Sequence, residues 1–129
     1  MIYVVGLGPG EAAGRTLAAQ RALEAADALV GYSTYLSLIR AEFPHKRLVE
    51  TPMRGERARC EEALRLSRAG QTVALVCSGD CNVYGMGSLL LELSIEGDEI
   101  ELVPGVTAAL SAAAALGAPL LRTTHQQGH

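Results

Sequence analysis

The stretch that most constrains the fold is Val73–Cys77, an uninterrupted apolar run that ends at Ser78, Gly79 and Asp80. Small and β-branched apolar residues without polar alternation are typical of a strand buried on both faces. The apolar stretch after this turn predicts a helix over about residues 84–93, so we expect the strand to be central in an α/β layer. Ligands of open α/β sheets bind beyond the carboxyl ends of the strands, and Asp80 is the charged residue placed there.

Strand and helix patterns alternate along the rest of the chain, which predicts an open α/β sheet of about five mostly parallel strands with helices on both faces. Thr16 and Ser33 are predicted N-caps, and Gly70 is predicted to end a helix. A single domain over residues 1–121 and a polar tail over residues 122–129 are expected. The other predicted strands are Ile2–Val5, Ala28–Tyr32, Leu48–Val49 and Glu99–Val103, and the other predicted helices are Thr16–Ala26, Thr34–Arg40, Glu56–Arg68 and residues 107–116.

Composition excludes several classes of protein. Hydrophobic residues make up 49% of the 129 residues and charged residues 19%, which is too apolar for a disordered chain. The net charge is −3 and the basic residues are scattered, so no nucleic-acid partner is expected. No apolar run approaches eighteen residues and no charged leader precedes the first strand, so we expect a cytoplasmic protein without a membrane partner.

The cysteines do not indicate a disulfide framework or a metal centre. Cys60, Cys77 and Cys81 are odd in number, which suits a reducing compartment. The spacing of Cys77 and Cys81 would supply half of a metal site, but no second pair completes four ligands. We therefore expect no metal.

The glycine-rich loop after the first predicted strand invites a nucleotide-binding interpretation, which its sequence disfavours. A dinucleotide fingerprint needs glycine where Glu11 stands, and Pro9 lacks the N–H that a phosphate cradle would use. In a phosphate-loop alignment, Arg15 occupies the place of the required lysine. We interpret Gly8, Pro9 and Gly10 as a rigid loop that a bulky ligand can approach closely, with an ordinary tight turn as the alternative.

Four motifs, in this order along the chain, resemble the tetrapyrrole methylase family. The similarity extends from residue 1 to about residue 120, and two of the motifs are most similar to the precorrin-3B methyltransferases of cobalamin biosynthesis. The resemblance implies the Rossmann-like N-terminal domain of such an enzyme. The four motifs are Val5–Gly10, Gly31–Ile39, Ser78–Met86 and Pro104–Ala108.

This resemblance implies S-adenosylmethionine as the methyl donor, S-adenosylhomocysteine as the product and a reduced, acidic tetrapyrrole as the acceptor. Members of this branch methylate precorrin-3B at C-17 while the ring contracts to precorrin-4, or act on the cobalt-containing equivalent. By this resemblance, the residues expected to bind the donor are those that match the family's motifs: Pro9, Ser78, Gly79, Asp80, Val83, Thr107 and Ala108.

On the acceptor side, the expected substrate-binding residues are Gly8, Gly10, Tyr35 and Arg54. Tyr32 is the catalytic candidate, because related enzymes at the uroporphyrinogen step have an acidic residue implicated in proton removal at its position. Arg54 suits the substrate carboxylates, although an exposed loop arginine is an equally good interpretation. The two tyrosines can line the substrate face or simply pack, and Thr107 can also cap its own helix.

Family members are about twice as long as this chain, with a second α/β domain that closes over the donor. We therefore expect either a fragment of a longer enzyme or a natural half that pairs with another chain. Apolar surface that the second domain would cover favours a homo-oligomer, such as a dimer. The alternative to an enzyme is a truncated, inactive domain that folds and self-associates without turnover.

Overall fold

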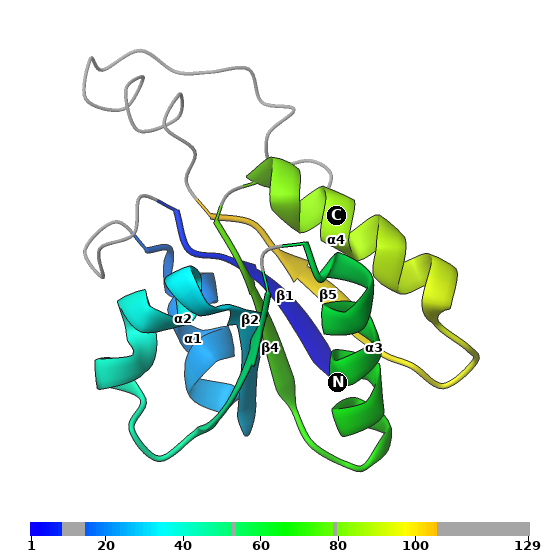
Figure 1. Ribbon diagram of the computed structural model, residues 1–129, viewed down its shortest axis with the longest axis horizontal. Helices are drawn as coiled ribbons and strands as arrows, with labels where there is room; N and C mark the ends of the chain where they lie inside the picture. Colours follow the sequence, from blue (N-terminus) through cyan, green and yellow to red (C-terminus); the bar gives the residue numbers. More distant parts are fainter. Residues whose placement is uncertain (9–14, 53, 79, 106–129) are drawn as a thin grey trace.

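The computed structural model of the chain describes residues 1–8, 15–52, 54–78 and 80–105, with the side chains of residues 80–82 outside the description (Figure 1). A five-stranded sheet with the order β3-β2-β4-β1-β5 forms the centre of this region. The elements, in chain order, are β1 (Ile2–Gly6), α1 (Leu17–Ala25), β2 (Ala28–Tyr32), α2 (Ser33–Ile39), the 3-10 helix η2 (Arg40–Glu42), β3 (Arg47–Thr51), α3 (Glu56–Arg68), β4 (Val73–Cys77), α4 (Asp80–Leu93) and β5 (Ile100–Val103).

The predicted central strand is confirmed. β4 lies between β2 and β1, and all of its residues are buried. Every strand pair is parallel, with Leu75 beside Val4 of β1 on one side and Val30 of β2 on the other. A strand with neighbours on both edges and helices on both faces has no solvated side, which explains its continuous apolar sequence.

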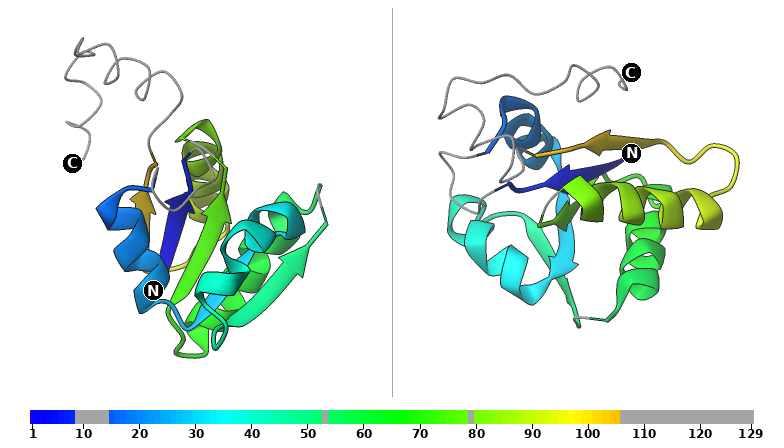
Figure 2. Two further views of the ribbon diagram at one scale, coloured as in Figure 1. Left: turned by 90° about the vertical axis from the view of Figure 1, so that its left-hand side faces the viewer. Right: turned by 90° about the horizontal axis from the view of Figure 1, so that it is seen from above.

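Helices α1 and α2 cover one face of the twisted sheet and α3 and α4 cover the other, as the fold prediction requires (Figure 2). Alternate residues of a strand point to opposite faces, so β4 contributes to two separate cores. Ala74 and Val76 pack in the core beneath α1 and α2. Val73, Leu75 and Cys77 pack in the core beneath α3 and α4.

Helix ends agree with the sequence at two of the three predicted positions. The Thr16 hydroxyl accepts a 3.1 Å hydrogen bond from the Ala19 N–H, so Thr16 is the N-cap of α1. Gly70 has φ +98° and follows the end of α3, as predicted for a residue that stops a helix. The prediction for Ser33 is wrong, because Ser33 is the first residue of α2 and the cap position belongs to Tyr32, whose side chain makes no capping bond.

Element boundaries differ from the sequence prediction in two further places. α4 begins at Asp80, about four residues before the predicted start, because the polar residues Asp80 and Asn82 in its first turn hide the helical pattern. β3 extends over five residues instead of two, since it is an edge strand whose alternation leaves short apolar runs. The predicted helix at 107–116 and the polar tail lie outside the described residues.

Candidate functional site

The strand order places a topological switch point at the carboxyl ends of the neighbouring strands β1 and β4. The chain leaves β1 toward α1 on one face of the sheet and leaves β4 toward α4 on the other. β1 and β4 are neighbours, so the two connections diverge beyond their carboxyl ends (Figure 1). Such a topological switch point is where open α/β sheets bind ligands. The residues at this point are Gly6 at the end of β1 with Leu7 and Gly8 after it, and Cys77 at the end of β4 with Ser78 after it.

The backbone at the end of β1 packs directly against the backbone after β5. A Cβ atom on Gly6 would lie 2.8 Å from the amide nitrogen of Gly105, and one on Gly105 would lie 2.7 Å from the carbonyl oxygen of Gly6. Gly8 has φ +74°, a conformation that favours glycine. The Leu7 N–H donates a 3.0 Å hydrogen bond to the Cys77 carbonyl, which joins this segment to β4. The main chain at the ends of β1, β4 and β5 therefore packs together and forms the floor of the switch point.

Helix α4 starts at this floor. Its first residue, Asp80, comes three positions after the last residue of β4, so the N–H groups of its first turn lie at the same edge of the sheet. Val83 is fully buried, with its Cγ2 atom 3.0 Å from the place of a Cβ on Gly6. The predicted donor-binding residue Val83 thus packs under the end of β1 as part of the core. Ser78 is partly buried between β4 and α4.

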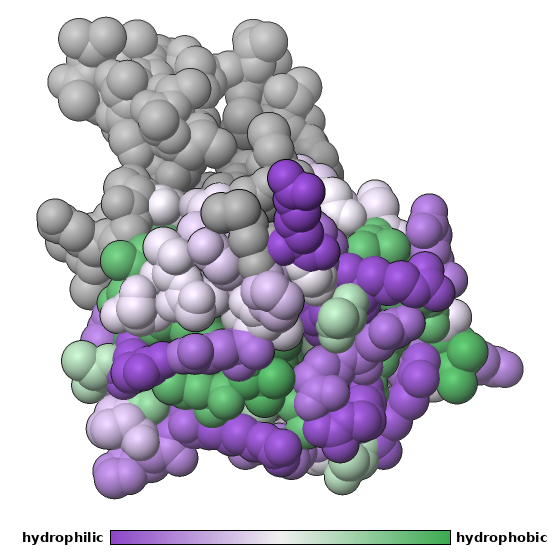
Figure 3. All heavy atoms as spheres, viewed as in Figure 1, coloured by the Kyte–Doolittle hydropathy of each residue, from purple (hydrophilic) through white to green (hydrophobic). Residues whose placement is uncertain are grey.

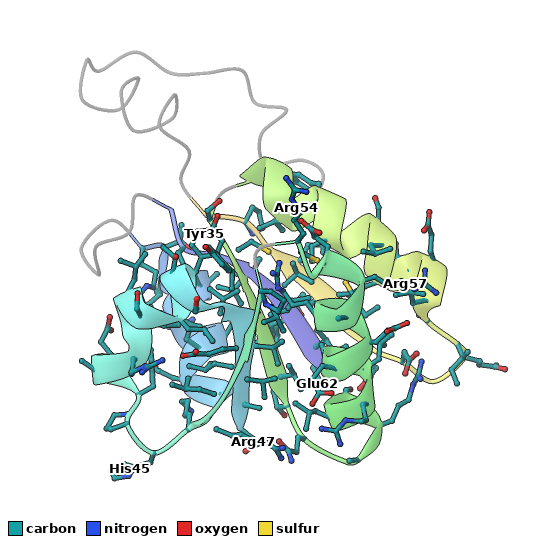
Figure 4. The ribbon with its side chains drawn as sticks, in the orientation of Figure 1. Tyr35, His45, Arg47, Arg54, Arg57 and Glu62 are labelled. Atoms are coloured by element: carbon teal, nitrogen blue, oxygen red, sulfur yellow. The ribbon has the colours of Figure 1, made fainter. Side chains whose placement is uncertain are left out.

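Tyr32 and Tyr35 lie together at the carboxyl end of β2. Their rings meet edge to face, with centroids 5.6 Å apart and planes at 82°. Both side chains are half-buried, so each packs and also presents surface to solvent. Figure 4 places Tyr35 toward the same end of the sheet as Arg54, whereas His45 and Arg47 lie at the opposite end.

Arg54 is exposed in the turn between β3 and α3 (Figure 4). The Gly55 N–H closes this turn with a 3.0 Å hydrogen bond to the Pro52 carbonyl. Arg54 therefore lies beyond the carboxyl end of β3, and its role in substrate binding stays a prediction. The structure thus brings the described candidates Gly8, Tyr32, Tyr35, Arg54, Ser78 and Val83 to one edge of the sheet.

The sequence analysis missed Arg59. It lies at this same edge, and the residue is only 5% exposed although it carries a charge. The nitrogen Nε donates to Thr51 Oγ1 at 2.6 Å, and Nη2 donates to the Pro52 carbonyl at 2.8 Å. The helical spacing of the sequence does indicate its burial. Arg59 lies four and seven residues before the buried Ala63 and Leu66 of α3, so it falls on the apolar side of that helix.

A second hollow lies beside this edge. It has a volume of about 420 Å³ and is open to solvent on the outer surface of α2 and β3. Hydroxyl groups and the ion pair between Arg40 and Glu50 line it, and none of its lining residues belongs to β1 or β4. The lining residues are Ser33, Thr34, Ser37, Arg40 and Glu50.

Some predicted site residues cannot be placed. Pro9, Gly10, Gly79, Thr107 and Ala108 lie outside the described residues, as does the side chain of Asp80.

Within the described ranges, no three histidine, cysteine or carboxylate side chains gather as metal ligands would. None of the helices in those ranges has the length and apolar character that crossing a membrane requires.

Comparison with known proteins agrees with the resemblance seen in the motifs. Residues 1–129 match the family described as Tetrapyrrole (Corrin/Porphyrin) Methylases. A probable cobalt-factor III C(17)-methyltransferase of Salmonella typhimurium is 45% identical over 124 residues, which cover 94% of this chain and 52% of the relative. The cobalt-factor III methyltransferase of Priestia megaterium is 39% identical, over 93% of this chain and 24% of the relative.

Solved structures show the same fold. The methyltransferase CobJ superposes with a TM-score of 0.77 at 40% identity, covering 92% of this chain and 52% of that protein. Uroporphyrin-III C-methyltransferase of Thermus thermophilus, complexed with S-adenyl homocysteine, superposes with a TM-score of 0.63 at 30% identity, over 87% of this chain and 47% of that one. The chain thus spans about half the length of several of its relatives.

Proposed function

Because the chain belongs to the tetrapyrrole (corrin/porphyrin) methylases, we propose that it is the donor-binding half of an S-adenosylmethionine-dependent methyltransferase of cobalamin biosynthesis. The reaction we propose is methylation at C-17 of precorrin-3B or its cobalt-containing counterpart, with contraction of the ring to the precorrin-4 level. The names of the relatives at 45% and 39% identity support this branch of the family.

One observation of the structure carries the proposal: the carboxyl ends of β1 and β4 meet at a topological switch point and are built of tightly packed main chain. Gly6 packs against Gly105, and Gly8 has a positive φ, so glycine backbone and not bulky side chains makes up these strand ends. Such a surface fits a flat, polar ligand such as an adenosyl group, which needs close approach and hydrogen bonds more than charge. Gly8 and Ser78, with Val83 beneath them, are the described residues that would hold the donor.

When bound, S-adenosylmethionine supplies an electrophilic methyl group on a sulfonium. The transfer disperses charge, so the protein contributes chiefly orientation and exclusion of water. Rigid main chain at three strand ends provides such orientation. The N–H groups at the start of α4 face the same edge and can donate to polar groups of the ligand.

The acceptor would lie over the carboxyl ends of β2 and β3. The rings of Tyr32 and Tyr35 offer an aromatic surface against which a macrocycle can pack. The Tyr32 hydroxyl is our candidate for the group that takes part in removing a proton from the substrate. Arg54 can pair with an acidic side chain of the substrate, because it is exposed and has no ion-pair partner among the described residues.

Calorimetric titration of the full chain with S-adenosylhomocysteine tests the donor site. We expect micromolar binding, about −8 kcal/mol, that weakens in Asp80→Asn. Glu92→Gln, an exposed carboxylate on the same helix, is the matched control and is expected to leave the affinity unchanged. Equal affinities of wild type and Asp80→Asn would remove Asp80 from the donor site.

The rival is a domain that folds and self-associates without turnover. Exposed apolar side chains on several elements favour association, although hydrophilic groups cover much of the face in Figure 3. Absence of binding heat together with dimers in analytical ultracentrifugation would support this rival. The exposed large apolar residues are Leu17, Leu38, Tyr84, Leu91, Ile95 and Leu102.

A further inference from the structure

Arg59 joins α3 to the ends of two strands through one guanidinium group. Its Nε donates to Thr51 Oγ1 at 2.6 Å, and the same hydroxyl donates to the Gly31 carbonyl of β2 at 3.3 Å. Its Nη2 donates to the Pro52 carbonyl at 2.8 Å. The guanidinium group is therefore fixed at the carboxyl ends of β2 and β3, which is where the acceptor is proposed to bind.

The turn that carries Arg54 depends on one of these bonds. The Pro52 carbonyl accepts both from Arg59 and from the Gly55 N–H, which closes the turn at 3.0 Å. Gly55 also accepts a 2.7 Å bond from the Arg59 N–H, and it offers no side chain of its own to cap α3. Arg59 thus holds both ends of the segment that contains Arg54.

Burying a guanidinium group costs desolvation free energy that an apolar side chain of similar size would not cost. Arg59 is 5% exposed and has no ion-pair partner among the described residues, so its desolvation is offset only by hydrogen bonds to neutral acceptors. A Met side chain would occupy this place without a charge to desolvate. What the guanidinium adds is a planar fork that reaches two acceptors at once.

We propose that Arg59 is a positioning residue for substrate binding, which fixes Thr51, Pro52 and Gly55 so that Arg54 is held toward an acidic side chain of the tetrapyrrole. The nature of the ligand rests on the proposed function. The positioning of the turn rests on the hydrogen bonds of Arg59 alone. The two parts can therefore be tested separately.

The first test needs no ligand. In Arg59→Met, amide hydrogen exchange at Gly55 is expected to accelerate at least about ten-fold, while exchange at Leu75 in β4 stays unchanged. Arg57→Met is the matched control, since Arg57 lies on the same helix, is exposed and pairs with Glu61 on the helix surface. Unchanged exchange at Gly55 would overturn the proposal. Should Arg59→Met fail to fold, Thr51→Val removes one acceptor and Arg59→Lys keeps the charge.

The second test uses uroporphyrin, an octacarboxylic tetrapyrrole, as the probe. Arg54→Ala and Arg59→Lys are each expected to weaken its binding about five-fold to twenty-fold, and the double variant no more than the larger single effect. Affinity for S-adenosylhomocysteine should be the same in all variants. Additive losses, or a parallel loss of donor affinity, would show that Arg59 does not act through Arg54.

Failure of the proposed function would give a different result from failure of the positioning role of Arg59. If the wild-type chain itself binds no uroporphyrin, the acidic tetrapyrrole is overturned as the ligand. The exchange rate at Gly55 then decides by itself whether Arg59 positions the turn.

Discussion

Gly6 and Gly105 pack backbone against backbone, and neither position has room for a side chain. A Cβ on Gly105 would lie 2.7 Å from the Gly6 carbonyl oxygen and 2.8 Å from the Gly8 amide nitrogen. Main-chain atoms cannot move aside as a side chain can. The end of β1 and the segment after β5 are therefore locked together at the floor of the proposed donor site.

Gly105→Ala is accordingly expected to lower the free energy of unfolding by about 2 to 3 kcal/mol, because the clash is with backbone. Binding of S-adenosylhomocysteine should weaken with it. Gly85→Ala is the control: a Cβ there meets nothing within 4 Å, and alanine in a helix gains about 0.5 to 1 kcal/mol. Urea unfolding measures both changes. A Gly105→Ala variant as stable as wild type would contradict the packing described here.

Gly87→Ala should cost much less than Gly105→Ala. Its Cβ would come within 2.6 Å of Leu102 Cδ2, the far end of a flexible side chain that is 37% exposed. Leu102 can rotate toward solvent, and the helix gains from alanine, so we expect a net change within about 1 kcal/mol. Urea unfolding again supplies the measurement. A loss equal to that of Gly105→Ala would mean that Leu102 is held in place.

Asp98 makes stability depend on pH. The Arg68 guanidinium donates two hydrogen bonds to its carboxylate, at 3.1 and 2.8 Å, and the Ile95 N–H donates a third, which lowers the pKa of Asp98. A carboxyl group with a lowered pKa in the folded state stabilises the protein above its unfolded pKa of about 3.9. That contribution is lost as the pH falls through the folded pKa.

Asp98→Asn should therefore cost about 1 kcal/mol at pH 7, a value discounted because Arg68 is partly exposed. The difference from wild type should shrink between about pH 4 and the acid limit, since both then lack the charge. Thermal unfolding across this range checks it, with the exposed Glu96→Gln as the control. A difference that stays constant with pH would exclude the ionised carboxylate as its cause.

Cys60 and Cys77 are expected to be unreactive in the folded protein. Burial raises the pKa of Cys60 to about 11 and that of Cys77 to about 12. The thiolate is the reactive form, so both thiols stay protonated near pH 8. In a Cys81→Ser background, a chromogenic disulfide reagent should label neither until denaturant is added. Rapid labelling of either thiol without denaturant would contradict this burial.

Local patterns were enough to predict most of the elements. The continuous apolar run of Val73–Cys77 indicated a strand without a solvated face, and the structure places β4 at the centre of the sheet. Thr16 and Gly70 act through bonds and dihedral angles within a few residues of themselves, so their roles could be read from neighbouring sequence. Ser33 failed as a cap because β2 continues to Tyr32 and passes directly into α2.

The candidate site was predicted where motifs carry it and missed where contacts between distant segments create it. Arg54 and Tyr35 stood in recognisable loops and motifs. Arg59 stood in a charged helix, and only its contacts with Thr51 and Pro52 show that it is buried. Whether a charged helical residue faces solvent or a strand end depends on how the helix is rotated against the sheet.

The sequence by itself therefore determined the alternation of strands and helices, the parallel sheet and the family, because these depend on periodicity, turn chemistry and motif order. Tertiary structure alone decided the strand order, the closure of Gly6 on Gly105 and the burial of Arg59. Each of these joins residues distant along the chain, whose contact is set by side-chain packing across the sheet and leaves no periodic trace in the sequence.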